Sequence, residues 1–159
     1  MANTLKLFLL FIAATVLHWA FMSVFGGAGV SLNVMLVFAC AVCAYLPPQY
    51  GYTAAFVCGL FLDFFGVKLF GNNALTFTLC ACMMYGLDKR LDFDAPAPQM
   101  ISLFALGLFA AVFNLALLRV FAGFSAWTGF WPLLSGVVFN AVLAPFVFWA
   151  VRRVFKRER

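Results

Sequence analysis

Charged side chains are what this chain has least of. Only 9% of its 159 residues are charged and a single histidine occurs, whereas 67% are hydrophobic. So few polar side chains cannot cover the surface of a water-soluble domain, which excludes a soluble enzyme or binding module. The scarcity of Asp, Glu and His also argues against a paired acid and base. We therefore expect an integral membrane protein that is not an enzyme and uses no cofactor.

Cysteine is present, but its surroundings do not favour redox or metal chemistry. Cys40 and Cys43 form a C-x-x-C pair, and Cys80 and Cys82 form a C-x-C pair. These pairs lie inside apolar runs without clustered His or carboxylate groups. Cysteine in such a place usually packs as a small apolar residue, so we predict no metal site. The chain also lacks a phosphate-binding glycine loop, a nucleophile elbow and a zinc-protease motif.

Long apolar runs predict an all-α, polytopic fold. A membrane-spanning helix needs about 20 mostly apolar residues, so the chain has room for about six spans and no soluble domain. The runs are continuously apolar, which favours helices over the alternating strands of a membrane barrel. We expect one integral membrane domain over 1–159, with an uncleaved first helix. The spans are predicted at 5–25, 30–46, 49–67, 72–87, 99–121 and 129–151, with a basic tail at 152–159.

Basic residues predict the orientation in the membrane. With six spans, both termini and the loops near Pro47 and Leu91 share one side, which holds most of the Lys and Arg residues. The other side has Lys68 and Arg119. The positive-inside rule then places both termini in the cytoplasm. The basic tail is expected to contact anionic lipid and not nucleic acid.

One carboxylate, Asp63, lies within the apolar third span. A charge inside a membrane is costly and usually faces protein or water. Small residues precede it at a spacing of four, which places them on the same helix face. The set is Gly51, Ala55, Gly59 and Asp63, with Gly66 about one turn further on. Small residues let helices approach closely, so we expect this face to pack against protein.

Two later spans carry similar faces. The sixth has Gly136 and Asn140 four residues apart, and the fifth has Gly107, Ala110 and Asn114 on one face. Taken singly, each asparagine is expected to hold neighbouring helices together, at about 1 kcal/mol or less.

Depth in the membrane predicts a polar notch on the outer side. At about 1.5 Å per residue, Asp63 and Asn114 lie near the outer ends of their helices and Asn140 near the middle. Arg119 lies near the outer end of the fifth span. We predict an outward polar cavity or docking notch in which Arg119 pairs with Asp63, with Lys68 as the competing partner.

The connection between the third and fourth spans contains Gly71, followed by Asn72 and Asn73. Either asparagine is well placed to cap the fourth helix. The free amide groups there could also meet an anion, although capping is the simpler expectation.

The central segment of the chain resembles a known family. Its pattern is Pro47-Pro48-Gln49-Tyr50-Gly51, Ala55-Phe56-x-x-Gly59-Leu60-x-x-Asp63-x-x-Gly66, Gly71-x-x-Ala74-Leu75 and Arg90-Leu91. This pattern resembles the central signature of the rod shape-determining protein MreD family. The length, the number of predicted helices and the basic tail agree with the resemblance.

The resemblance implies a non-catalytic component of the bacterial inner membrane that helps the elongation machinery build sidewall peptidoglycan and set cell shape. Members of the family bind MreC and, through the complex, MreB, RodA and a penicillin-binding transpeptidase. We expect the membrane helix of MreC to pack on a small-residue face such as that of Gly59.

The resemblance also implies a fold similar to the substrate-binding component of energy-coupling-factor transporters. This likeness gives the alternative function, a small-molecule binding or transport subunit with a ligand near Asp63, Asn114 and Asn140. The first span lacks the Ala-x-x-x-Ala face with which such subunits dock to their energising partner, and this absence weighs against the alternative.

Overall fold

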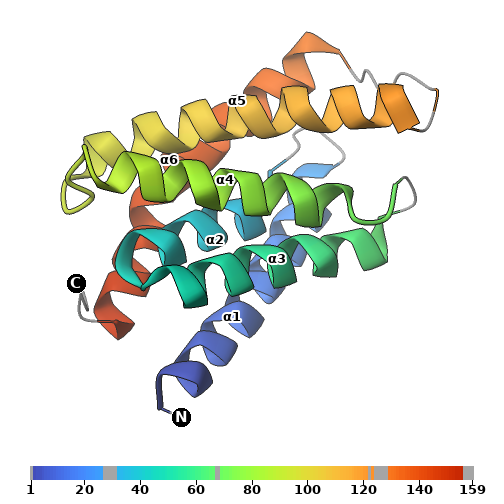
Figure 1. Ribbon diagram of the computed structural model, residues 1–159. Helices are drawn as coiled ribbons and strands as arrows, with labels where there is room; N and C mark the ends of the chain where they lie inside the picture. Colours follow the sequence, from blue (N-terminus) through green and yellow to red (C-terminus); the bar gives the residue numbers. More distant parts are fainter. Residues whose placement is uncertain (1, 27–31, 67–68, 122, 124–128, 156–159) are drawn as a thin grey trace.

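The computed structural model describes residues 2–26, 32–66, 69–121, 123 and 129–155. Within these residues the chain is all helical, which confirms the all-α part of the predicted fold (Figure 1). The described elements are α1 (Ala2–Phe25), α2 (Val34–Tyr45), α3 (Pro48–Phe65), α4 (Asn72–Asp88), α5 (Pro96–Phe121) and α6 (Phe130–Val154).

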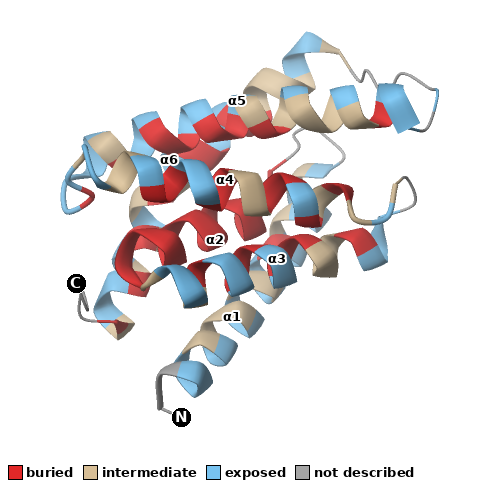
Figure 2. Cartoon of the chain, viewed as in Figure 1, coloured by how far each residue is buried: buried red, intermediate tan, exposed pale blue. Residues whose placement is uncertain are grey.

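The second helix forms the centre of the bundle. α2 packs against α1, α3, α4 and α6, and all of its residues are buried (Figure 2). Its 12 residues extend over about 18 Å, well short of the roughly 30 Å hydrocarbon core. The helix is therefore shorter than the span predicted at 30–46. Its apolar sequence reflects burial by protein on all sides, which hydropathy does not distinguish from contact with lipid.

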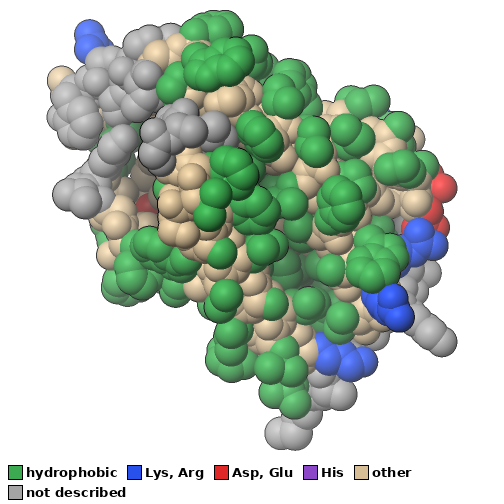
Figure 3. Space-filling model, turned by 180° about the vertical axis from the view of Figure 1, so that it is seen from behind, with side chains coloured by type: hydrophobic (Ala, Val, Ile, Leu, Met, Phe, Trp, Pro, Cys, Tyr) green, Lys and Arg blue, Asp and Glu red, His purple; other side chains and the backbone are tan. Residues whose placement is uncertain are grey.

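Among the described residues, three helices, α1, α5 and α6, are long and apolar enough to cross a membrane. Exposed large hydrophobic side chains include Phe8 and Val16 on α1 and Phe146 on α6. Figure 3 shows hydrophobic side chains spread over one face of the bundle. α1 is the least enclosed helix, and its main contact is with α2. The length, the composition and the exposed apolar surface indicate a multi-pass membrane protein.

Polar side chains form hydrogen bonds and an ion pair between helices at one end of the bundle. The Tyr45 hydroxyl at the end of α2 donates a hydrogen bond to the Phe93 carbonyl at 3.0 Å, and the Gln99 side-chain amide donates to the same carbonyl at 2.6 Å. Arg152 near the end of α6 forms a 3.5 Å ion pair with Asp94. These contacts place the ends of α2 and α6 beside the turn between α4 and α5.

Candidate functional site

Asp63 is 4% exposed and lies in the last turn of α3. Its Oδ1 accepts hydrogen bonds from the backbone N–H of Asn73 at 3.0 Å and from the side-chain amide of that residue at 2.9 Å. Its Oδ2 accepts from the backbone N–H of Ala74 at 3.0 Å. The carboxylate therefore caps the first turn of α4, where free N–H groups and the helix dipole favour negative charge.

A close approach of α3 to α4 makes this cap possible. Gly59 lies one turn before Asp63, and a Cβ atom there would come within 2.5 Å of the Ala74 Cα and of the Asn73 carbonyl oxygen. No side chain fits in that space. α4 starts after Gly71, whose φ of +89° lies in the left-handed region that favours glycine. The two glycines together bring the start of α4 within reach of a short carboxylate side chain.

The small-residue face of α3 is filled by the chain itself. Gly51, Ala55, Gly59 and Asp63 are all buried, and α3 packs closely on α4. A Cβ atom on Gly51 would overlap the hydroxyl of Tyr85 from α4. The face points inward, as the spacing predicts, but α4 occupies the space in which a partner's helix would lie.

A cavity of about 270 Å³ lies beside the cap of α4. Two of its lining residues also contact Thr76, whose hydroxyl donates to the Asn72 carbonyl at 2.7 Å and lies 2.8 Å from the amide oxygen of Asn114. Within the described part of the chain, the buried Oδ1 of Asn72 has no hydrogen-bond partner. The cavity wall is therefore rich in acceptors, one of which is unused. The lining comprises Asp63, Gly66, Leu69, Asn72, Asn73, Asn114 and Leu118.

Asn140, on α6, supports the start of another helix. Its Oδ1 accepts a hydrogen bond from the backbone N–H of Asn33 at 2.9 Å. Asn33 is the N-cap of α2, and its own Oδ1 accepts from the Leu36 N–H at 3.1 Å. At the other end of α2, the Tyr85 hydroxyl donates to the Leu46 carbonyl at 3.2 Å. Asn140 thus holds the central helix and is not among the residues that line the cavity.

The predicted ion pair between Asp63 and Arg119 is wrong. Both carboxylate oxygens bond to the start of α4, and Arg119 is exposed near the end of α5 without a bond to Asp63. The N–H groups of a helix start supply the positive potential that sequence reasoning assigned to the guanidinium group. The side chains of Asn72 and Asn73 do not cap α4 as predicted, because Asp63 reaches its N–H groups from another helix. Lys68, the competing partner, lies outside the described residues.

The remaining predicted site residues fall into two places. Gly136 and Gly107 are buried on α6 and α5, which pack against each other. A Cβ atom on Gly107 would lie 3.5 Å from a Val137 methyl group, so this contact is ordinary van der Waals packing. Gly66 ends α3, and its N–H donates to the Asp63 carbonyl at 3.2 Å.

Three residues that sequence reasoning missed take part in these contacts: Tyr45, Thr76 and Tyr85. Each carries a hydroxyl inside or at the end of an apolar run. Tyr and Thr are common within apolar helices, so a hydropathy pattern does not mark their hydroxyls as points of contact. The sequence does contain a signal for these contacts, because a hydroxyl buried in a membrane needs a hydrogen-bond partner.

The chemistry available at the site is limited to hydrogen bonding. Among the described residues, no group of three or more His, Cys, Asp or Glu side chains could hold a metal ion. The cysteines are free thiols, and all except Cys82 are buried. The lining of the cavity offers the Asp63 carboxylate, which the start of α4 holds in place, together with the amide groups of three asparagines. This arrangement suits a structural or binding role.

Comparison with known proteins identifies a family. The family model described as rod shape-determining protein MreD matches residues 1–154. No curated protein and no solved structure shows significant similarity to the chain. The expected likeness to energy-coupling-factor transporter subunits therefore stays a prediction.

Proposed function

The chain belongs to the MreD family of rod shape-determining proteins, and we propose that it is a membrane scaffold that binds MreC in the bacterial elongation complex. Through MreC it positions MreB, RodA and a penicillin-binding transpeptidase, and so it helps to control cell shape. It lies in the cytoplasmic membrane with both termini in the cytoplasm. The observation that carries the proposal is the family match over residues 1–154.

The hydrogen bonds that the buried polar side chains form support a scaffold role. Asp63 and Asn140 each bond to backbone N–H groups at the start of a neighbouring helix. Groups used in this way fix the relative positions of helices and are not free for chemistry. A protein that positions partners depends on such a fixed shape.

The partner helix packs, in this proposal, on the outer face of α5. The faces around Gly59 and Gly136 are filled within the bundle, so they do not supply the surface predicted from the sequence. Ala105 and Ala116 are exposed and eleven residues apart, which puts them on one face of α5, three turns from each other. Small residues on an exposed face allow the close approach that helix association in membranes needs. The same stripe includes Ile101, Leu108, Val112 and Arg119.

Replacing the exposed alanines with Phe tests this surface. Ala105→Phe and Ala116→Phe keep the face apolar but hold a partner helix away, so MreC should no longer co-purify with the tagged protein. Ala20→Phe is the matched control, because Ala20 is an exposed alanine on α1. Cells that depend on the α5 variants should become round, whereas the control should keep rods. Unchanged recovery of MreC with both α5 variants would remove α5 from the proposal.

The family-level proposal has a separate test. Deletion of the gene should give round cells, and the tagged wild-type protein should recover MreC from detergent extracts. Rods in the deletion strain, together with no recovery of MreC, would overturn the scaffold role whichever helix is used.

A small-molecule binding subunit is the second candidate function. The observation that favours it is the cavity of about 270 Å³ with the unused Asn72 acceptor. Asp63 and Asn114 line this cavity, but the third predicted ligand contact, Asn140, does not. Native mass spectrometry of the purified protein tests the candidate. A bound small molecule that is lost on Asn72→Ala substitution would support it, and a ligand-free mass would oppose it.

A further inference from the structure

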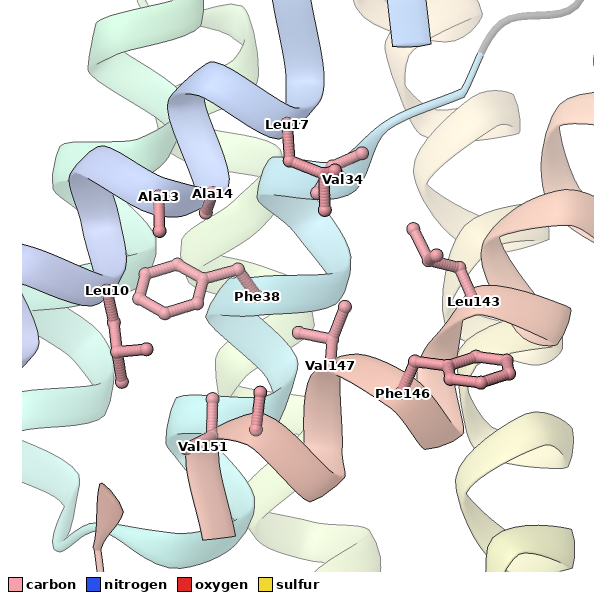
Figure 4. Close-up of a pocket in the computed structure, with 11 residues that line it drawn as sticks. Leu10, Ala13, Ala14, Leu17, Val34, Phe38, Leu143, Phe146, Val147 and Val151 are labelled. Atoms are coloured by element: carbon pink, nitrogen blue, oxygen red, sulfur yellow. The ribbon is translucent and has the colours of Figure 1, made fainter. Parts of the chain in front are cut away.

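A lateral groove with a volume of about 180 Å³ separates α1 from α6. Figure 4 shows α2 between α1 and α6, with side chains from all three helices around the groove. The groove is apolar throughout its lining. Its walls include Leu10, Ala14 and Leu17 from α1, Val34 and Phe38 from α2, and Val147 from α6.

Two cations lie beyond one end of this groove. Lys6 precedes Leu10 by four residues on α1, and Arg153 follows Ala150 by three residues on α6. Residues at these spacings lie on the same helix face, so both cations extend the walls of the groove by one turn. Both are exposed, and the Arg153 guanidinium lies 5.2 Å from the centre of the Trp149 ring. Most of the Lys and Arg side chains visible in Figure 3 gather along one edge of this apolar surface.

We propose that the groove binds one anionic phospholipid, with an acyl chain between α1 and α6 and the phosphate between Lys6 and Arg153. Lipid tails are as apolar as leucine, so the bilayer itself fills a groove that opens to it. The cations then select the headgroup, because basic side chains at the membrane surface attract anionic lipid. Arg152 remains with Asp94 in the ion pair at 3.5 Å, so the proposal does not need it.

Bulky side chains argue against a partner helix in the same groove. Close packing of membrane helices needs small residues along the contact. Ala13 and Ala14 on α1 meet this need, but Leu143 and Phe146 line the opposite wall. A flexible acyl chain follows such a surface more easily than a rigid helix does.

The first test measures lipid selectivity. The full chain is reconstituted in vesicles of phosphatidylcholine and phosphatidylglycerol in equal amounts, released into detergent, and examined by native mass spectrometry for retained lipid. One phosphatidylglycerol should be retained. Affinity for added phosphatidylglycerol should fall about fivefold for Lys6→Gln or Arg153→Gln, and about thirtyfold for both together.

Two further variants separate the groove from general surface charge. Lys89→Gln/Arg90→Gln removes two exposed cations from the turn between α4 and α5, and it should leave lipid retention unchanged. Ala150→Phe fills the groove and keeps both proposed cations, and it should also abolish retention. Thermal unfolding in detergent shows that each variant is folded.

Several results would overturn the proposal. One is equal loss of lipid in the control variant, because that would indicate a nonspecific effect of charge. Another is retention of phosphatidylglycerol by a folded Ala150→Phe variant, which would place the lipid elsewhere. A dimeric mass without lipid would assign the groove to a second copy of the chain.

Discussion

Removal of the Asp63 carboxylate tests the helix cap directly. In an Asp63→Ala variant, the backbone N–H groups of Asn73 and Ala74 lose their acceptor at the start of α4. Each unsatisfied buried donor costs about 1–3 kcal/mol, so the free energy of unfolding should fall by about 2–6 kcal/mol. Asp63→Asn keeps one acceptor oxygen but turns an N–H donor toward the other backbone N–H, and it should cost about 1–3 kcal/mol. The assay is equilibrium unfolding in detergent micelles, followed by the loss of helical circular dichroism.

Arg119→Gln is the matched control for this experiment. Arg119 is exposed and has no bond to Asp63, so its loss should change stability by less than about 0.5 kcal/mol. In the double variant Asp63→Asn/Arg119→Gln the two losses should add, with a coupling below about 0.5 kcal/mol. A coupling above about 1 kcal/mol would show that the two side chains interact. An Asp63→Ala variant as stable as the wild type would refute the cap.

Three further tests, the first of which compares two variants, probe the packing and the hydrogen bonds at the ends of the other helices, each by unfolding in detergent. Gly59→Ala should lower the melting temperature, since its Cβ would lie 2.5 Å from the backbone of α4. Gly107→Ala is the control and should leave the melting temperature nearly unchanged, because its Cβ would lie 3.5 Å from its nearest neighbour. Equal changes in the two variants would contradict the close approach of α3 to α4 at Gly59. Asn140→Ala should cost about 1–3 kcal/mol because the Asn33 N–H loses its acceptor, and faster hydrogen exchange at the start of α2 should accompany it. Tyr85→Phe should cost about 1 kcal/mol because the Leu46 carbonyl loses its donor, and a variant without any loss would show that another donor replaces the hydroxyl.

The helical fold and the inward-facing side of α3 could be predicted because both depend on local sequence. Apolar runs define helices whatever surrounds them, and a spacing of four places Gly51, Ala55, Gly59 and Asp63 on one face without knowledge of the partner. The length of α2 could not be predicted in the same way. A helix buried by protein and a helix in contact with lipid have the same hydropathy, so an apolar run does not reveal which of the two surrounds it.

The partners of the polar residues were beyond the reach of sequence reasoning for a different reason. Sequence reasoning pairs Asp63 with Arg119, because a residue with a side chain of opposite charge can be identified from the sequence alone. The positive end of α4 consists of backbone N–H groups that every residue has, and their position depends on how α3 and α4 pack. Asn140 illustrates the same point, because the N–H that it binds belongs to Asn33, more than one hundred positions earlier in the chain.

The wide separation of Asn33 and Asn140 along the sequence has a consequence for the order in which the protein folds. The residue that accepts this hydrogen bond at the start of α2 lies on α6, which is synthesised after the other five described helices. Until α6 is made, the Asn33 N–H at the beginning of α2 lacks this acceptor, and α2 lacks one of the helices that bury it. The surroundings of the central helix are therefore completed late in the synthesis of these six helices. A truncated product that ends before α6 would carry a recognisable defect at its core, which membrane proteases could use to remove it.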